Sequence, residues 1–194
     1  MVKYIVTGLA YLMFGIFFNN LFSQEKYEKE SRLKQDDVPY SALNFIDSLS
    51  LKNKVKWYLE EGIESKSVEA KFKRNGKKYS VEFDTFGNIE DVEIEMKWDD
   101  LQGPLKKPIS TRLNEDCIKH KIVKTQIQYT GNRVALFLKL LGGEPIGNLT
   151  VKYEIVVKCR SEKNTELFEY LFTDKGQLIS ASTIVFKTSN HLEY

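Results

Sequence analysis

The chain has 194 residues, and its 42% hydrophobic and 12% aromatic content is enough for a real core in one or two domains. Its 29 basic and 27 acidic side chains leave a formal net charge of +2. That balance favours neither nucleic acid nor an anionic membrane surface as a partner, so we expect no nucleic-acid binding.

The first 23 residues have the order of a secretory signal peptide. Lys3 precedes an apolar run over 4–18, and two asparagines and Ser23 follow it. The run is shorter than the roughly 20 residues that a spanning helix needs. We therefore expect cleavage after Ser23, a periplasmic or secreted mature chain, and no stable membrane span after signal removal. An uncleaved anchor is the alternative.

A polar segment and a short helix follow. Residues 24–37 are almost wholly charged or polar, so we expect a polar leader or an edge strand. Beyond Pro39, the three-residue spacing of Leu43, Ile46 and Leu49 predicts an amphipathic helix over 39–51.

Strands come next, and a hairpin gives the clearest local signal. Apolar and polar residues alternate over 55–59, as in a half-buried strand. Asn75-Gly76 then predicts a two-residue turn, which fixes the register of the strands on either side. We expect these cross-strand pairs: Arg74 with Lys77, Phe72 with Tyr79, Ala70 with Val81, and Val68 with Phe83.

After a turn at 84–88 and a strand over 92–96, the same order of signals begins again from Pro108. A helix with Ile109, Leu113 and Cys117 on one stripe is followed by a strand over 122–129 and by three later strands. Phe83, Gly87 and Ile89 each have a counterpart 89 positions later, at Phe172, Gly176 and Leu178.

We therefore predict an α+β fold of two tandem repeats, each a helix packed on a four-stranded antiparallel sheet. The first repeat covers 38–100. The second, divergent repeat covers 101–190 and carries an insert at about 130–149, which we expect to be a helical or irregular excursion over the sheet.

Several short runs carry a resemblance to a known family. The runs are Trp57-Tyr-Leu-Glu-Glu, Val68-Glu-Ala-Lys, Tyr79-Ser-Val-Glu-Phe-Asp84 and Gly87-Asn-Ile-Glu-Asp-Val92-Glu. They resemble the PepSY-like family of exported bacterial proteins, which in turn resemble the repeats of the β-lactamase inhibitory protein. The resemblance covers 38–97 well and 108–186 in outline. It implies this fold and a setting outside the cytoplasm, and it brings no catalytic residue with it.

Cys117 and Cys159 are the only cysteines. In an oxidising compartment they can close one disulfide, and two buried free thiols are the alternative. The helix stripe that ends at Cys117 should pack on the sheet face that holds Cys159. We therefore expect the two α-carbons within about 7 Å of each other.

The chain offers little for catalysis. It has two histidines, and it lacks a phosphate-binding glycine loop, a zinc ligand set and a cofactor fingerprint. Asp91, Glu93 and Glu95 share one strand face and could bind calcium or a basic partner, but a solvated face balanced by lysines is the favoured interpretation. We expect no enzyme activity, catalytic residue, metal or cofactor.

The favoured hypothesis is an exported, non-enzymatic binding module, protein-binding or inhibitor-like, whose partner is another exported protein. The alternatives are a carboxylate-dependent hydrolase of envelope glycans, which would use the acidic strand and Asp99-Asp100, and a small-ligand sensor. Phe137 is a further exposed-aromatic candidate. The candidate partner-binding residues are Tyr58, Phe86, Lys71, Lys78, Asp91 and Glu93.

Overall fold

A computed structural model describes residues 24–63, 65–162 and 164–186. The expected signal peptide and its cleavage site lie outside these ranges. The 3-10 turns in the described ranges are η1 (Gln35–Asp37) and η2 (Trp98–Asp100). The other elements, in chain order, are β1 (Gln24–Leu33), α1 (Tyr40–Asp47), β2 (Lys56–Glu61), β3 (Lys66–Arg74), β4 (Lys77–Asp84), β5 (Ile89–Glu95), α2 (Gly103–Asp116), β6 (Lys119–Gly131), α3 (Arg133–Leu141), β7 (Leu149–Arg160), β8 (Thr165–Thr173) and β9 (Leu178–Phe186).

All nine strands belong to one sheet, in the order of the chain. Consecutive strands pair antiparallel, and β1 also pairs parallel with β9, which closes the sheet into a barrel. The prediction of two tandem helix-plus-four-strand repeats is therefore wrong. Strands β5 and β6 pair from Asp91 opposite Thr130 to Glu95 opposite Gln126, so the two halves share one set of hydrogen bonds. An unpaired strand edge leaves backbone groups without partners, and this pairing satisfies them.

The polar leader is a strand rather than a loop or an edge. Strand β1 pairs with β2 on one side and with β9 on the other. Its polar composition hid this role, because no apolar face distinguishes it from a disordered segment.

The hairpin prediction is confirmed in every pair. Strands β3 and β4 align Phe72 with Tyr79 and Val68 with Phe83. Asn75 and Gly76 have φ angles of 50° and 76°, the positive values that a type I′ turn requires.

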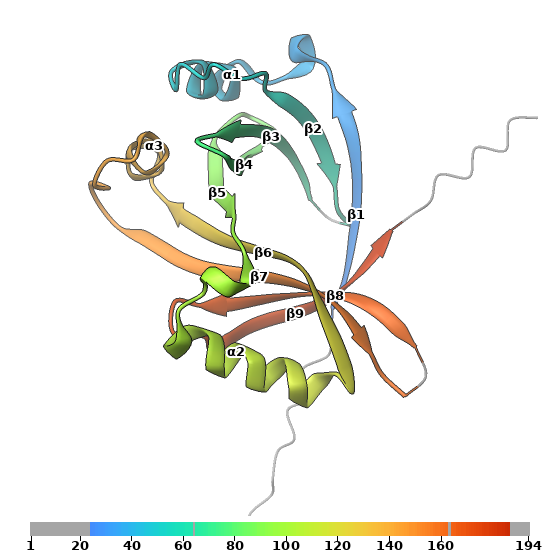
Figure 1. Ribbon diagram of the computed structural model, residues 1–194. Helices are drawn as coiled ribbons and strands as arrows, with labels where there is room; N and C mark the ends of the chain where they lie inside the picture. The colour runs from blue at the N-terminus through green and yellow to red at the C-terminus, as the bar shows by residue number, and fades with distance from the viewer. Residues whose placement is uncertain (1–23, 64, 163, 187–194) are drawn as a thin grey trace, which may run out of the picture.

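Two apolar clusters lie on the outer face of the barrel under the helices. In Figure 1, α1 and α3 lie at the top and upper left, and α2 lies at the bottom, with the sheet between them. Helices α1 and α3 cover the first cluster, in which Phe45 and Leu136 pack over Phe83 and Trp57. The insert is thus helical and covers the sheet, as expected.

Helix α2 covers the second cluster, where Ile109 and Leu113 meet Tyr170 and Phe172. The helix begins at Gly103, five residues before the predicted start, so Pro108 lies inside it. At its end, Cys117 forms a disulfide with Cys159 of β7, with the α-carbons 5.4 Å apart.

A glycine turn packs against a helix in each half of the chain. A Cβ atom on Gly87 would lie 2.8 Å from the backbone nitrogen of Ala42 in α1, and one on Gly176 would lie 2.6 Å from Cγ of Pro108 in α2. Both glycines also have positive φ angles, of 83° and 76°. The close approach and the backbone conformation both require glycine at these two turns.

Candidate ligand site in the barrel interior

The polar face of the sheet encloses a cavity of about 550 Å³ inside the barrel. Side chains alternate between the two faces of a strand, so the residues between the apolar ones of the outer face point inward. Nine carboxyl groups and only two lysines line this cavity, which we call the acidic cavity. The carboxyl groups come from many strands and include Glu30, Glu60, Glu82, Glu154 and Glu169.

Asp91 of β5 is buried in the wall of the acidic cavity, with 8% of its surface exposed. Its Oδ2 accepts a hydrogen bond of 2.9 Å from Nε2 of Gln128, whereas its Oδ1 has no hydrogen-bond partner among the described residues. Burial, together with the charges of Glu93 and Glu82, raises the pKa of Asp91 to about 9. Without a ligand, the protein therefore disfavours the charged form of this carboxyl group.

Glu93 lies two residues further along the same face. Its Oε2 accepts a hydrogen bond from Nε2 of Gln126 on β6. Burial raises the pKa of Glu93, and the nearby Lys124 opposes that rise. Oε1 of Gln126 is buried and has no hydrogen-bond partner among the described residues. Oδ1 of Asp91 and Oε1 of Gln126 are thus both buried side-chain oxygens that no described residue satisfies.

Lys71 of β3 is the cation that balances one side of the acidic cavity. Its Nζ pairs with Oε2 of Glu30 and, at 2.7 Å, with Oε2 of Glu69. It also lies 4.9 Å from the centre of the Tyr58 ring. Burial alone would lower the pKa of Lys71, but the hydrogen bonds and charges of the two carboxylates outweigh it and raise that pKa.

Oxygens of Glu30, Glu60 and Glu69 lie within 4.8 Å of one another, a spacing that a metal ion could bridge. Because the Lys71 ammonium group already pairs with two of the three, a metal ion there would have to displace it.

The structure brings three of the six candidate residues into the acidic cavity: Lys71, Asp91 and Glu93. Tyr58 and Lys78 line a neighbouring cavity. Phe86 lies apart from both at a hairpin tip, with 81% of its surface exposed. The interpretation of a solvated sheet face is wrong for Asp91, because closure of the barrel encloses that face.

Two other candidate residues, Phe137 and Asp99, lie outside the acidic cavity. Phe137 packs against the first apolar cluster, with its ring 5.6 Å from that of Phe45, so it belongs to the outer face. Asp99 lies in η2, where it pairs with Lys106, and it does not line the acidic cavity.

Sequence reasoning missed the carboxyl groups that come from distant strands. The sequence places Glu30 in the polar leader, and it gives no separate role to Glu154 or Glu169. Glu154 and Glu169 alternate with apolar residues, but this alternation is the same for a sheet face in water and for one inside a barrel.

No helix in the described ranges is long and apolar enough to cross a membrane.

No family model matches the chain, and neither does any curated protein. Solved structures do match. A DUF2874 family protein from Bacteroides ovatus is 13% identical with a TM-score of 0.50, covering 75% of this chain and 87% of that one. A second DUF2874 family protein, from Bacteroides uniformis, is 15% identical with a TM-score of 0.48, covering 75% and 89%. A Bacteroides eggerthii protein, described provisionally as periplasmic, is 11% identical with a TM-score of 0.48, covering 75% and 88%.

At these identities the likeness to the Bacteroides ovatus protein shows a similar fold alone. The resemblance to the PepSY-like family and to the β-lactamase inhibitory protein is not confirmed by these comparisons.

Proposed function

We propose that this chain is an exported, non-enzymatic binding module whose ligand site is the acidic cavity. Asp91 carries the proposal, because a buried carboxyl group with an unpaired oxygen is unfavourable without a ligand. The proposal of export rests on the sequence of residues 1–23.

The ligand group that fits this cavity is a cation with hydrogen-bond donors, such as an ammonium or guanidinium group. Nine carboxyl groups and two lysines line the cavity, although the whole chain carries a formal net charge of +2. A cation next to Asp91 would favour its ionised form and would supply a donor to the unpaired Oδ1 of that carboxyl group.

The cavity also has a route to solvent. Ile63, which is 70% exposed, lies at its rim, whereas Asp91 lies in its wall. The cation could therefore belong to a small molecule or to a lysine or arginine side chain of another exported protein.

Calorimetric titration with spermidine tests the proposal. We expect binding to the purified chain 24–194, weakened on the order of tenfold by Asp91→Asn because one ionisable partner is lost. Asp36→Asn is the matched control, since Asp36 is exposed in η1 and lies outside the acidic cavity. Absence of spermidine binding, or equal weakening by both substitutions, would contradict the proposal.

A hydrolase is the second candidate, because Asp91 and Glu93 are carboxyl groups with raised pKa values in one cavity. A neutral carboxyl group beside ionised ones is the arrangement of a general acid in glycoside hydrolysis. Release of reducing ends from purified peptidoglycan, abolished by Glu93→Gln, would favour this candidate over a binding module. Unchanged peptidoglycan would count against it.

A further inference from the structure

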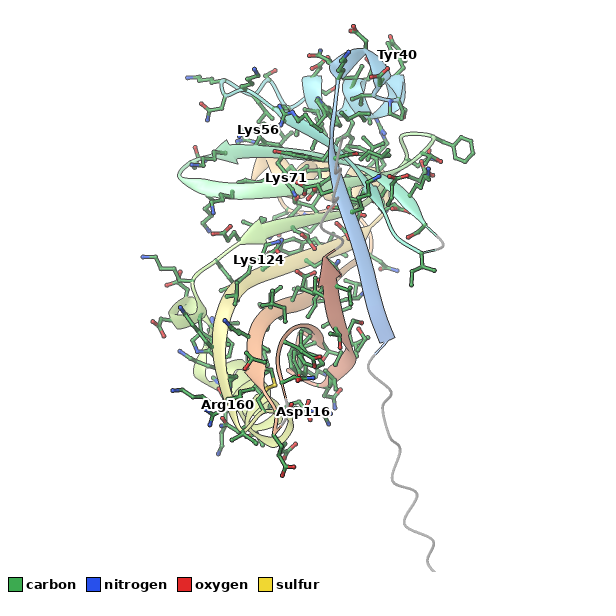
Figure 2. The ribbon with its side chains drawn as sticks, turned by 90° about the vertical axis from the view of Figure 1, so that its right-hand side faces the viewer. Tyr40, Lys56, Lys71, Asp116, Lys124 and Arg160 are labelled. Atoms are coloured by element: carbon green, nitrogen blue, oxygen red, sulfur yellow. A yellow bond between two sulfur atoms is a disulfide. The ribbon has the colours of Figure 1, made fainter. Side chains whose placement is uncertain are left out.

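A second cavity of about 690 Å³ is lined by residues of the five neighbouring strands β2 to β6. Six lysines and one carboxyl group line it, so we call it the lysine cavity. It shares Lys71, Ser80 and Lys124 with the acidic cavity, so the two cavities adjoin each other. Figure 2 shows Lys56 and Lys71 on neighbouring strands, with Lys124 further along the sheet. The six lysines are Lys54, Lys56, Lys71, Lys73, Lys78 and Lys124.

Four of these lysines lie directly opposite one another. Lys56 of β2 is paired in register with Lys71 of β3, and Lys73 of β3 is paired with Lys78 of β4. Like charges directly opposite each other on neighbouring strands repel and destabilise the sheet. Two such pairs on one face, beside a cavity, are unfavourable in the isolated protein.

Carboxylates neutralise only part of this charge. Lys78 pairs with Glu95 at 2.9 Å, and Lys71 pairs with the carboxylates of the acidic cavity. Among the described residues, Lys56 and Lys73 make no ion pair, and neither does Lys54. One member of each opposed pair therefore has no counter-charge from the protein.

The wall of the lysine cavity adds positive charge and rigidity. Tyr58 lines it, and both Arg32 and Lys71 lie 4.9 Å from the centre of that ring. Tyr79 also lines it and stacks on Phe72, with the two rings 3° from parallel. The packed rings give the cavity a rigid side next to the lysines, so this part of the wall need not be ordered when an anion binds.

We infer that the lysine cavity binds a multivalent oxyanion, a ligand that carries several phosphate or carboxylate groups. Such a ligand supplies the counter-charge that Lys56 and Lys73 lack and cancels the repulsion across both pairs. This site adjoins the proposed cation site but rests on Lys56 and Lys73, which do not line the acidic cavity, so neither proposal depends on the other.

Calorimetric titration at about 50 mM NaCl, with tripolyphosphate and with citrate, tests the inference, because weak screening favours such contacts. We expect at least one of the two to bind. The double variant Lys56→Gln/Lys73→Gln should lower its affinity on the order of tenfold or more. A preference for tripolyphosphate assigns the ligand to phosphates, and a preference for citrate assigns it to carboxylates.

The matched control is Lys121→Gln/Lys158→Gln. These two lysines are also paired directly opposite each other, on β6 and β7, but they line neither cavity. Each double variant removes two charges and relieves like-charge repulsion, so both should raise the melting temperature without ligand. Only the first should weaken anion binding.

Equal loss of affinity in the two double variants, or no binding of either anion, would overturn the inference. Spermidine binding should persist in Lys56→Gln/Lys73→Gln. A failure of the anion site is therefore separable from a failure of the cation site.

Discussion

The two faces of this sheet bury opposite kinds of side chain, apolar ones on the outer face and charged ones on the inner face. On the outer face, apolar side chains such as Phe83 and Ile155 are fully buried beneath helices, and burial itself stabilises them. On the inner face, carboxyl groups such as Asp91 and Glu69 are more than nine-tenths buried, although burial disfavours a charged group. Packing on the outer face thus stabilises the fold, and that fold keeps the charged residues of the inner face close together.

The difference shows that burial alone does not identify a core. Glu69 is stabilised by Lys71 and by a hydrogen bond from Ser80, whereas Asp91 keeps one oxygen unpaired. A buried polar group without a partner lowers the stability of the folded chain, and such groups are often found at sites where a ligand supplies the partner.

Truncation on the outer face should give the largest effect. Phe83→Ala removes a fully buried ring that lies 5.7 Å from the ring of Phe45 and 6.1 Å from that of Trp57. We expect urea unfolding to show a loss of about 3–5 kcal/mol. Phe86→Ala removes the same side chain from an exposed turn and should change stability by no more than about 0.5 kcal/mol. Equal losses would break the distinction between the faces.

Removal of the disulfide should cause the next largest loss of stability, because the bond joins the end of α2 to the outer face of β7. Cys117 and Cys159 are 42 residues apart, so replacing both by alanine frees a long loop in the unfolded chain. We expect a loss of about 2–4 kcal/mol in guanidinium unfolding. Wild-type protein treated with a reductant should show the same loss, and insensitivity to reduction would contradict the bond.

Asp91→Asn should change how stability depends on pH. Because the pKa of Asp91 is raised from an ordinary 3.8 to about 9, the folded chain keeps a proton that the unfolded chain releases above about pH 4. The stability of the wild type should therefore fall as pH rises between those two values, by up to about 1.4 kcal/mol per pH unit for this group. Asparagine cannot ionise, so the variant should lose this slope.

Urea unfolding of both proteins at about pH 5 and about pH 8 checks this. The variant should gain stability relative to the wild type at the higher pH. Parallel curves for the two proteins would mean that Asp91 is solvated.

Lys71→Met should give the smallest change in stability to unfolding. The substitution removes the ammonium group between Glu30 and Glu69, and because Lys71 is partly exposed we expect a loss of only about 1 kcal/mol. Added Ca²⁺ should raise the melting temperature of this variant more than that of the wild type, since the carboxylate cluster has lost its own cation. Lys73→Met is the control, because Lys73 makes no ion pair among the described residues.

The hairpin could be predicted because its signal is local, whereas the closed barrel depends on strand pairings that no local pattern predicts. Asn75-Gly76 fixes its turn through the backbone preferences of two adjacent residues, so every second pair from Arg74–Lys77 out to Val68–Phe83 could be counted. The cavity depends on β5 pairing with β6 and on β1 pairing with β9. No local pattern encodes those contacts, and Glu30 reads as a solvated residue until its strand is placed.

The carbon-13 NMR titration of the Asp91 side-chain carboxyl group tests the central claim most directly. In the isolated protein we expect it to titrate near pH 9, because burial and neighbouring carboxylates disfavour the charged form. Saturating spermidine should lower that pKa, since a cation at the cavity wall favours the ionised group. Titration near the ordinary value of 3.8 in the isolated protein, or no change when spermidine is added, would contradict a buried acidic site built to receive a cation.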